Sequence, residues 1–163
     1  MRKASFAPVV TPDTRVLILG SLPGEASLAA GRYYAHPQNQ FWRLMGGVVG
    51  RDLAALDYDA RLSVLLSARV GLWDTVGTAR REGSLDGALR AIEGNPLADL
   101  TATLPALRAV GFNGATAARL GHKALAWADG LALLDLPSSS AAFCRIGVAE
   151  KARAWNRLRD HLA

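Results

Sequence analysis

Short apolar runs alternate with longer segments of helical periodicity along this chain. The apolar runs lie at residues 16–20, 70–73, 107–112 and 131–136, and their length and composition are typical of buried β-strands. Apolar residues at helical spacing predict helices that begin near Asn39 or Gln40, that cover about 58–68 after an N-cap at Asp57, and that cover about 148–162. A further helix is expected after Asn113-Gly114.

The segment between the second and third apolar runs has no clear pattern. Its residues 76–84 are polar and contain glycine, so we expect a loop there, followed by a short helix capped by Ser84. Asn95-Pro96 predicts the start of another helix, and residues 1–14 are expected to form an extended lead-in. Strands separated by helices predict an α/β fold, a three-layer α/β/α sandwich with a central four-stranded, mainly parallel sheet, in a single domain over residues 1–163.

Polar or glycine- and proline-rich residues follow every predicted strand. They lie at 20–23, 74–75, 113–114 and 137–140. Because the carboxyl ends of parallel strands share one edge of a sheet, and ligands bind at that edge, we expect one common cleft. The loop after the first strand also brings tyrosines, His36, amides and Trp42 together within ten residues, a mixture that suits a flat polar ligand.

Composition and charge narrow the function classes. The net charge is +5 and arginine carries most of the basic excess; a polyanionic partner and an arginine-biased genome explain this charge equally well. One cysteine and three widely separated histidines predict no disulfide, iron–sulfur cluster or metal site. The chain has no apolar run of membrane-spanning length and no signal-peptide pattern, so we expect no membrane association and a cytoplasmic location.

Several common cofactor and hydrolase motifs are absent from the sequence. It contains no GxGxxG, GxxxxGK[ST], GxSxG or HExxH, so we expect no cofactor. What remains is an aromatic and amide-rich loop, in which Tyr34 stacks on an unpaired base or packs in the core. A serine-rich loop at 138–140 binds phosphate through its backbone N–H groups or is a plain turn.

Six short segments occur in a fixed order between residues 20 and 140: GSLPGEAS, YYAHPQNQFW, GLWD, GSLD, FNG and LPSSS. In this order the chain resembles the uracil-DNA glycosylase superfamily, and most closely its hypoxanthine-DNA glycosylase family, also called DNA-deoxyinosine glycosylases. The resemblance implies a monofunctional enzyme that flips a deaminated base out of DNA and hydrolyses its N-glycosidic bond.

The resemblance also implies roles for particular residues. Asn39 matches the position that carries catalysis in the hypoxanthine family, and Tyr34 matches the position whose ring stacks on the flipped base. Asp74 is expected either to accept the N1–H of hypoxanthine or to be an ordinary loop carboxylate. The remaining expected base-binding residues are Gly20, Ser21 and Leu22, and the expected DNA-binding residues are Pro23, Gly24, His36, Ser138, Ser139 and Ser140.

Three departures from the superfamily pattern affect the expected substrate. Leu22 stands where many members have an Asp or Asn that positions water, which favours the hypoxanthine family. Leu136 stands where uracil enzymes have a His or Asn that donates to the uracil carbonyl, which disfavours uracil. Phe143 lies in the segment that replaces the usual tail of the last motif, and is either a wedge for the DNA stack or a core residue.

We therefore expect a monomeric DNA glycosylase of bacterial type that acts on hypoxanthine in double- or single-stranded DNA and is associated with the nucleoid when it does so. Three alternatives stay open: the same fold acting mainly on uracil, a DNA-binding module without catalysis, and a small-molecule enzyme of doubly wound fold.

Overall fold

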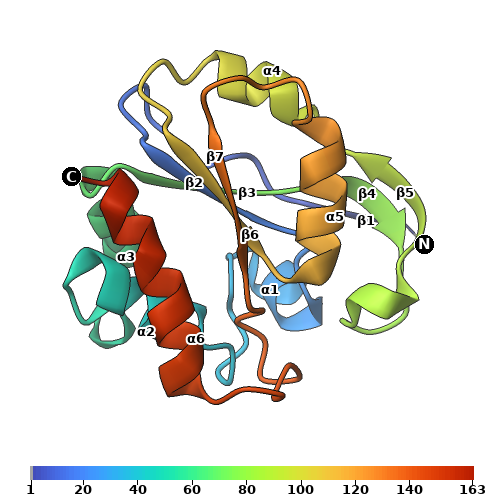
Figure 1. Ribbon diagram of the computed structural model, residues 1–163. Coiled ribbons are helices and arrows are strands. Elements are labelled where there is room, and N and C mark those ends of the chain that lie inside the picture. The colour runs from blue at the N-terminus through green and yellow to red at the C-terminus, as the bar shows by residue number, and fades with distance from the viewer. Residues whose placement is uncertain (1) are drawn as a thin grey trace.

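A four-stranded parallel sheet forms the centre of the protein, which is described by a computed structural model for residues 2–163 (Figure 1). The strands stand in the order β3-β2-β6-β7 and all pair in parallel. Their bounds are β2 Val16–Gly20, β3 Val70–Asp74, β6 Ala109–Asn113 and β7 Ala132–Leu136. The four predicted strands are confirmed to within two residues, because continuous apolar runs are buried on both faces of a parallel sheet.

Helices cover both faces of this sheet, so the three-layer α/β/α architecture is confirmed. Val16 and Ile18 of β2 face one layer, which consists of α2 (Phe41–Val49), α3 (Tyr58–Ser67) and α6 (Val148–Trp155). Leu17 and Leu19 alternate to the opposite layer, which consists of α4 (Leu97–Ala102) and α5 (Ala115–Ala124). Figure 1 shows α2, α3 and α6 on one side of the strands and α5 on the other.

Helices α2, α3 and α6 begin within two residues of the positions expected from the sequence. The Asp57 carboxylate accepts the Ala60 N–H at 2.8 Å and caps α3, as predicted. Helix α2 begins after Gln40, and its buried side is formed by residues at helical spacing. The predicted C-terminal helix is divided: α6 ends at Trp155 and a 3-10 helix, η3, continues over Asn156–His161. Another 3-10 helix, η1, covers Leu53–Ala55.

A second, antiparallel sheet was not predicted from the sequence. It has the order β1-β4-β5, with bounds Arg2–Ala4, Val76–Arg80 and Arg90–Gly94. The expected loop over 76–84 and the expected helix after Ser84 are therefore wrong; only a short 3-10 helix, η2, forms at Asp86–Ala88. Strand β5 is exposed along its whole length, so it has none of the apolar alternation by which strands are recognised. The small sheet is anchored by a cluster of Leu22, Val76, Ala79 and Leu89.

The carboxyl ends of the four parallel strands open toward one set of loops. The first of these loops contains a short helix, α1 (Glu25–Ala30), which ends at Gly31 in the left-handed conformation. The connection between β4 and β5 and the segment after β7 lie at the same end of the molecule as α1, the lower end in Figure 1. Within residues 2–163, none of the helices is both long and apolar enough to cross a membrane.

Candidate active site

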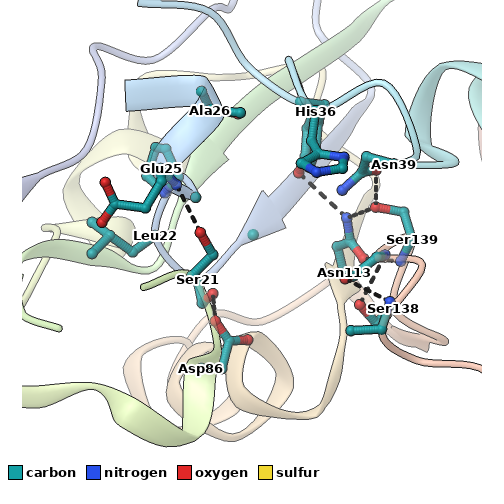
Figure 2. Close-up of a pocket in the computed structure, with 18 of the residues that line it drawn as sticks. Ser21, Leu22, Glu25, Ala26, His36, Asn39, Asp86, Asn113, Ser138 and Ser139 are labelled. Carbon is teal, nitrogen blue, oxygen red and sulfur yellow. Dashed lines mark hydrogen bonds between the residues drawn. The ribbon is translucent and has the colours of Figure 1, made fainter. Parts of the chain in front are cut away.

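The loops at the carboxyl ends of the strands enclose a cavity of about 550 Å³. In Figure 2, Ser21, Leu22, Glu25 and Asp86 lie on one side of it, and His36, Asn39, Asn113 and Ser139 lie on the other. All the site residues named from the sequence line this cavity: Gly20, Ser21, Leu22, Pro23, Gly24, Tyr34, His36, Asn39, Asp74, Ser138, Ser139 and Ser140. The structure therefore brings these residues together, while their individual roles stay predictions.

Tyr34 presents one face of its ring to the cavity. The other face is stacked on the buried ring of Phe41, with centroids 3.8 Å apart and an interplanar angle of 9°. The Tyr34 backbone has a φ of 52°, a conformation that costs a bulky residue on the order of 1–3 kcal/mol. The indole N–H of Trp42 donates to the Tyr34 carbonyl at 3.2 Å and helps to hold it there. Tyr34 is thus a fixed aromatic platform.

Asn39 is held by its carbonyl oxygen. Its Oδ1 accepts the Phe41 backbone N–H at 2.9 Å and the Ser139 hydroxyl at 2.8 Å, which occupies both lone pairs. In the part of the chain that the structure describes, the Nδ2 amide donates no hydrogen bond. Asn39 therefore offers the cavity a hydrogen-bond donor.

Asn113 and Ser139 fix the wall beside Asn39. The Asn113 amide donates to the Ser139 hydroxyl at 2.9 Å and to the Tyr34 hydroxyl at 3.4 Å, and its Oδ1 accepts the Ser139 N–H at 2.9 Å. Asn113 does not cap the next helix, because α5 has Gly114 as its N-cap and no side-chain cap. The network joins three loops far apart in sequence, so no local pattern reveals it.

Asp74 is a buried carboxyl group at the floor of the cavity. Its side chain is 3% exposed, and within residues 2–163 its Oδ2 has no hydrogen-bond partner. Burial, followed by the nearby negative charge of Asp86, raises the pKa of Asp74 to about 7, although Arg81 acts in the opposite direction. A buried acceptor without a hydrogen bond lowers the stability of the free protein. A ligand that brings an N–H donor to Asp74 would supply the missing hydrogen bond.

Asp86 and Arg81 are site residues that the sequence interpretation missed. The Ser21 hydroxyl donates to Asp86 Oδ1 at 2.5 Å (Figure 2), and burial raises the Asp86 pKa while this hydrogen bond lowers it. The buried Arg81 guanidinium donates to the carbonyls of Leu22 and Pro23, at 3.4 and 2.5 Å. Both residues lie in the segment whose strands were not predicted. The only signal for Asp86 in the sequence was its place in GSLD, one of the six segments that carry the family resemblance.

The opposite rim is formed by the serine loop, residues 138–140. Ser138 accepts the Ser140 N–H through its hydroxyl at 3.2 Å. Behind the loop, the ammonium group of Lys151, 1% exposed, donates to Gln40 Oε1 at 2.8 Å and to the Ser140 carbonyl at 3.2 Å. His36 is exposed on the neighbouring loop, and its Nδ1 accepts the Gln38 N–H. This rim offers hydroxyl groups and a nearby positive charge to an anion.

The site does not have the composition of a metal centre. Over residues 2–163, no three His, Cys, Asp or Glu side chains are grouped so that they could hold a metal ion. The three ingredients of the cavity are an aromatic face, an amide donor and a buried carboxyl acceptor. Together they can enclose a planar heterocycle and form hydrogen bonds with its edge.

The chain is similar in sequence to known proteins. The family model of the uracil DNA glycosylase superfamily matches residues 7–159. A hypoxanthine DNA glycosylase from Methanosarcina barkeri is 43% identical over 114 residues, which are 70% of this chain and 72% of the relative. A hypoxanthine DNA glycosylase from Methanosarcina acetivorans is 39% identical over 142 residues, which are 87% of this chain and 89% of the relative.

A solved structure has the same fold. The solution NMR structure of a candidate uracil DNA glycosylase from Methanosarcina acetivorans superposes with a TM-score of 0.87 and 36% identity, and covers 99% of each chain. The match extends over both sheets and all the loops that line the cavity. This chain therefore belongs to the uracil DNA glycosylase superfamily.

Proposed function

We propose that the protein is a DNA glycosylase that removes hypoxanthine from DNA by hydrolysing its N-glycosidic bond. Superfamily membership and the names of the two Methanosarcina relatives support glycosylase chemistry. The observation that favours a base with a ring N–H over adenine is Asp74, a buried carboxyl that lines the cavity and whose Oδ2 has no hydrogen-bond partner within residues 2–163. The proposed substrate is a deaminated nucleotide in double- or single-stranded DNA, bound by one copy of the chain.

The edge of hypoxanthine complements an ionised Asp74. Hypoxanthine has a hydrogen on N1, whereas adenine has a lone pair there. A carboxylate accepts hydrogen bonds only, so it binds the N1–H of hypoxanthine and repels N1 of adenine. Because the Asp74 pKa is about 7, this discrimination strengthens as the pH rises through neutrality.

Tyr34 supplies the surface on which the flipped base rests. The bond to be broken is hidden inside the duplex, so the nucleotide must leave the stack before it can react. The exposed face of the Tyr34 ring replaces part of the lost base stacking, which is worth about 1–3 kcal/mol per base. Since Phe41 supports the ring from behind, the platform does not tilt when the base is absent.

Asn39 assists the departure of the base. As the glycosidic bond breaks, negative charge develops on the leaving base and positive charge on the sugar. The Nδ2 amide of Asn39 donates a hydrogen bond to the leaving base and so stabilises the negative charge that develops on it. The serine loop holds a neighbouring phosphate, whose negative charge stabilises the sugar cation.

A base-release assay tests the proposal. Labelled duplexes with a single hypoxanthine, uracil, xanthine, adenine or guanine are incubated with the protein, and abasic sites are cleaved with alkali. We expect cleavage at hypoxanthine, little at adenine, and loss of cleavage in Asn39→Ala. Cleavage at uracil alone would overturn the choice of base, because the N3–H of uracil also fits Asp74. Salt-sensitive binding without any cleavage would identify a DNA-binding module instead.

A further inference from the structure

Lys151 is a buried lysine that takes no part in the chemistry proposed for the cavity. It lies on the side of α6 that also buries Trp155, and it is 1% exposed. Lysine is almost never fully buried unless its charge is paired, yet among residues 2–163 no carboxylate forms an ion pair with it. A methionine of similar length would fill the same space without the cost of burying a charge. What the ammonium group adds is a set of directed hydrogen bonds.

The ammonium group is directed at two segments that border the cavity. It donates to Gln40 Oε1 at 2.8 Å and to the Ser140 carbonyl at 3.2 Å. Gln40 is the N-cap of α2, and Ser140 is the last residue of the serine loop. Phe143, the wedge candidate from the sequence, is half-buried, and its ring centroid lies 5.3 Å from the Lys151 Nζ. The lysine thus connects the serine loop to the start of α2.

This connection lies beside the hydrogen bond that orients Asn39. The Ser139 hydroxyl donates to Asn39 Oδ1 at 2.8 Å, and the Gln40 N–H donates to the Ser139 carbonyl at 2.9 Å. Gln40 follows Asn39 and Ser140 follows Ser139 in the chain, so Lys151 joins the same two segments one residue further along. Because Ser139 holds the Asn39 oxygen, the position of the serine loop sets the direction in which the Asn39 Nδ2 donates.

We propose that Lys151 is a positioning residue for Asn39: it clamps Ser140 to Gln40 and so keeps the Asn39 amide directed at the leaving base. The inference rests on the proposed function, because that function supplies the base. Lys151 is not among the residues that line the cavity, so it acts through Asn39 and not on the reacting bond. A donor that stabilises charge in a transition state has to be held in its direction before the reaction begins.

A kinetic test asks whether the effect of Lys151 passes through the Asn39 amide. Single-turnover excision of hypoxanthine is measured at saturating protein, so that DNA affinity does not enter the rate, for the wild type, Lys151→Met, Asn39→Asp and the double variant. Lys123→Met, at an exposed lysine of α5, removes one positive charge elsewhere and is the matched control. We expect Lys151→Met to slow excision about tenfold in the wild-type background and not to slow it further beside Asn39→Asp, while Lys123→Met leaves the rate unchanged.

An NMR measurement tests the same inference without catalysis. The side-chain amide of Asn39 in the free protein gives a proton–nitrogen resonance, which is assigned by its absence in Asn39→Ala. We expect Lys151→Met to shift this resonance and Lys123→Met to leave it in place. If Lys151→Met does not fold, Gln40→Ala removes one of the two acceptors without changing α6, and both measurements are made on that variant with the same expected results.

The positioning role would be overturned by either measurement. An equal loss from Lys151→Met in the wild-type and Asn39→Asp backgrounds would show that the lysine acts independently of the amide, and an equal loss from Lys123→Met would assign the effect to net charge. An unshifted Asn39 resonance in Lys151→Met would show that the lysine does not hold the amide. A shifted resonance in a protein that cleaves no hypoxanthine would count against the proposed function alone.

Discussion

Replacing Asp74 by asparagine should make the protein more stable at neutral pH and change little in acid. Burial, and then the charge of Asp86, raise the Asp74 pKa from 3.8 to about 7. The native state therefore favours the protonated carboxyl, and the unfolded chain ionises first. The stability associated with the neutral group is fully present below about pH 4 and is lost as the pH rises from about 4 to about 7.

The size of this effect follows from the shift. A difference of about 3 pKa units corresponds to about 4 kcal/mol, at 1.36 kcal/mol for each unit. Asparagine has nearly the same shape and cannot ionise, so Asp74→Asn avoids that loss. The difference in unfolding free energy between the variant and the wild type should therefore grow by about 4 kcal/mol between pH 4 and pH 8, including the relief of repulsion on Asp86.

Urea unfolding followed by tryptophan fluorescence measures this difference directly. Both proteins are titrated at several pH values, and the free energies are subtracted at each pH so that all other titrating groups cancel. Asp129→Asn, at an exposed carboxylate far along the chain, is the matched control for the loss of one carboxyl group. If the unfolding free energy of Asp74→Asn changes with pH in parallel with that of the wild type, the Asp74 pKa is not raised in the folded protein. The proposal that Asp74 recognises the edge of the base then loses its main support.

Three further substitutions probe the other walls of the cavity. Asn39→Asp keeps the acceptor that Phe41 and Ser139 use and replaces the donor by a negatively charged acceptor, which repels the charge that develops on the leaving base, so single-turnover excision should fall about 10²–10³-fold; retained activity would contradict the donor role. Ser139→Ala leaves the Asn113 amide without its best partner, and should lower the unfolding free energy by about 1–3 kcal/mol and slow excision, as urea titration and rate measurements can check. Lys151→Met removes the buried charge behind the serine loop, and the slope of log Kd against log salt for DNA should fall by up to about one; an unchanged slope would show that the charge does not reach the phosphate.

The central sheet could be predicted because its signals are local. Strands β2, β3 and β6 are apolar runs that are buried on both faces, and the edge strand β7 is an apolar run that is mostly half-buried. The positions of the strand ends then place Gly20, Asp74, Asn113 and the serine loop at one edge before any contact is known. The sequence alone therefore predicts which segments come together to line the cavity.

The small sheet and the hydrogen-bond network could not be predicted in the same way. Strand β5 is exposed throughout and β4 buries only two residues, so neither produces a periodic pattern. Arg81 acts by donating to two backbone carbonyls, and such acceptors have no sequence signature. The orientation of the Asn39 amide depends on Ser139, one hundred residues away, and becomes visible only in three dimensions.

The cavity contains two features that reduce the stability of the free protein. Tyr34 has a left-handed backbone conformation, and Asp74 has a buried oxygen to which no group of residues 2–163 donates. A leucine at position 74 or a glycine at position 34 would remove one of these costs, yet each would also remove a group that faces the cavity. Departures from local rules that persist inside a well-packed domain concentrate at functional sites. A base edge supplies the N–H donor that Asp74 lacks, and a base face covers the ring that the strained Tyr34 backbone holds at the cavity. The strained tyrosine and the unpaired carboxyl thus point independently to the same occupant of the cavity.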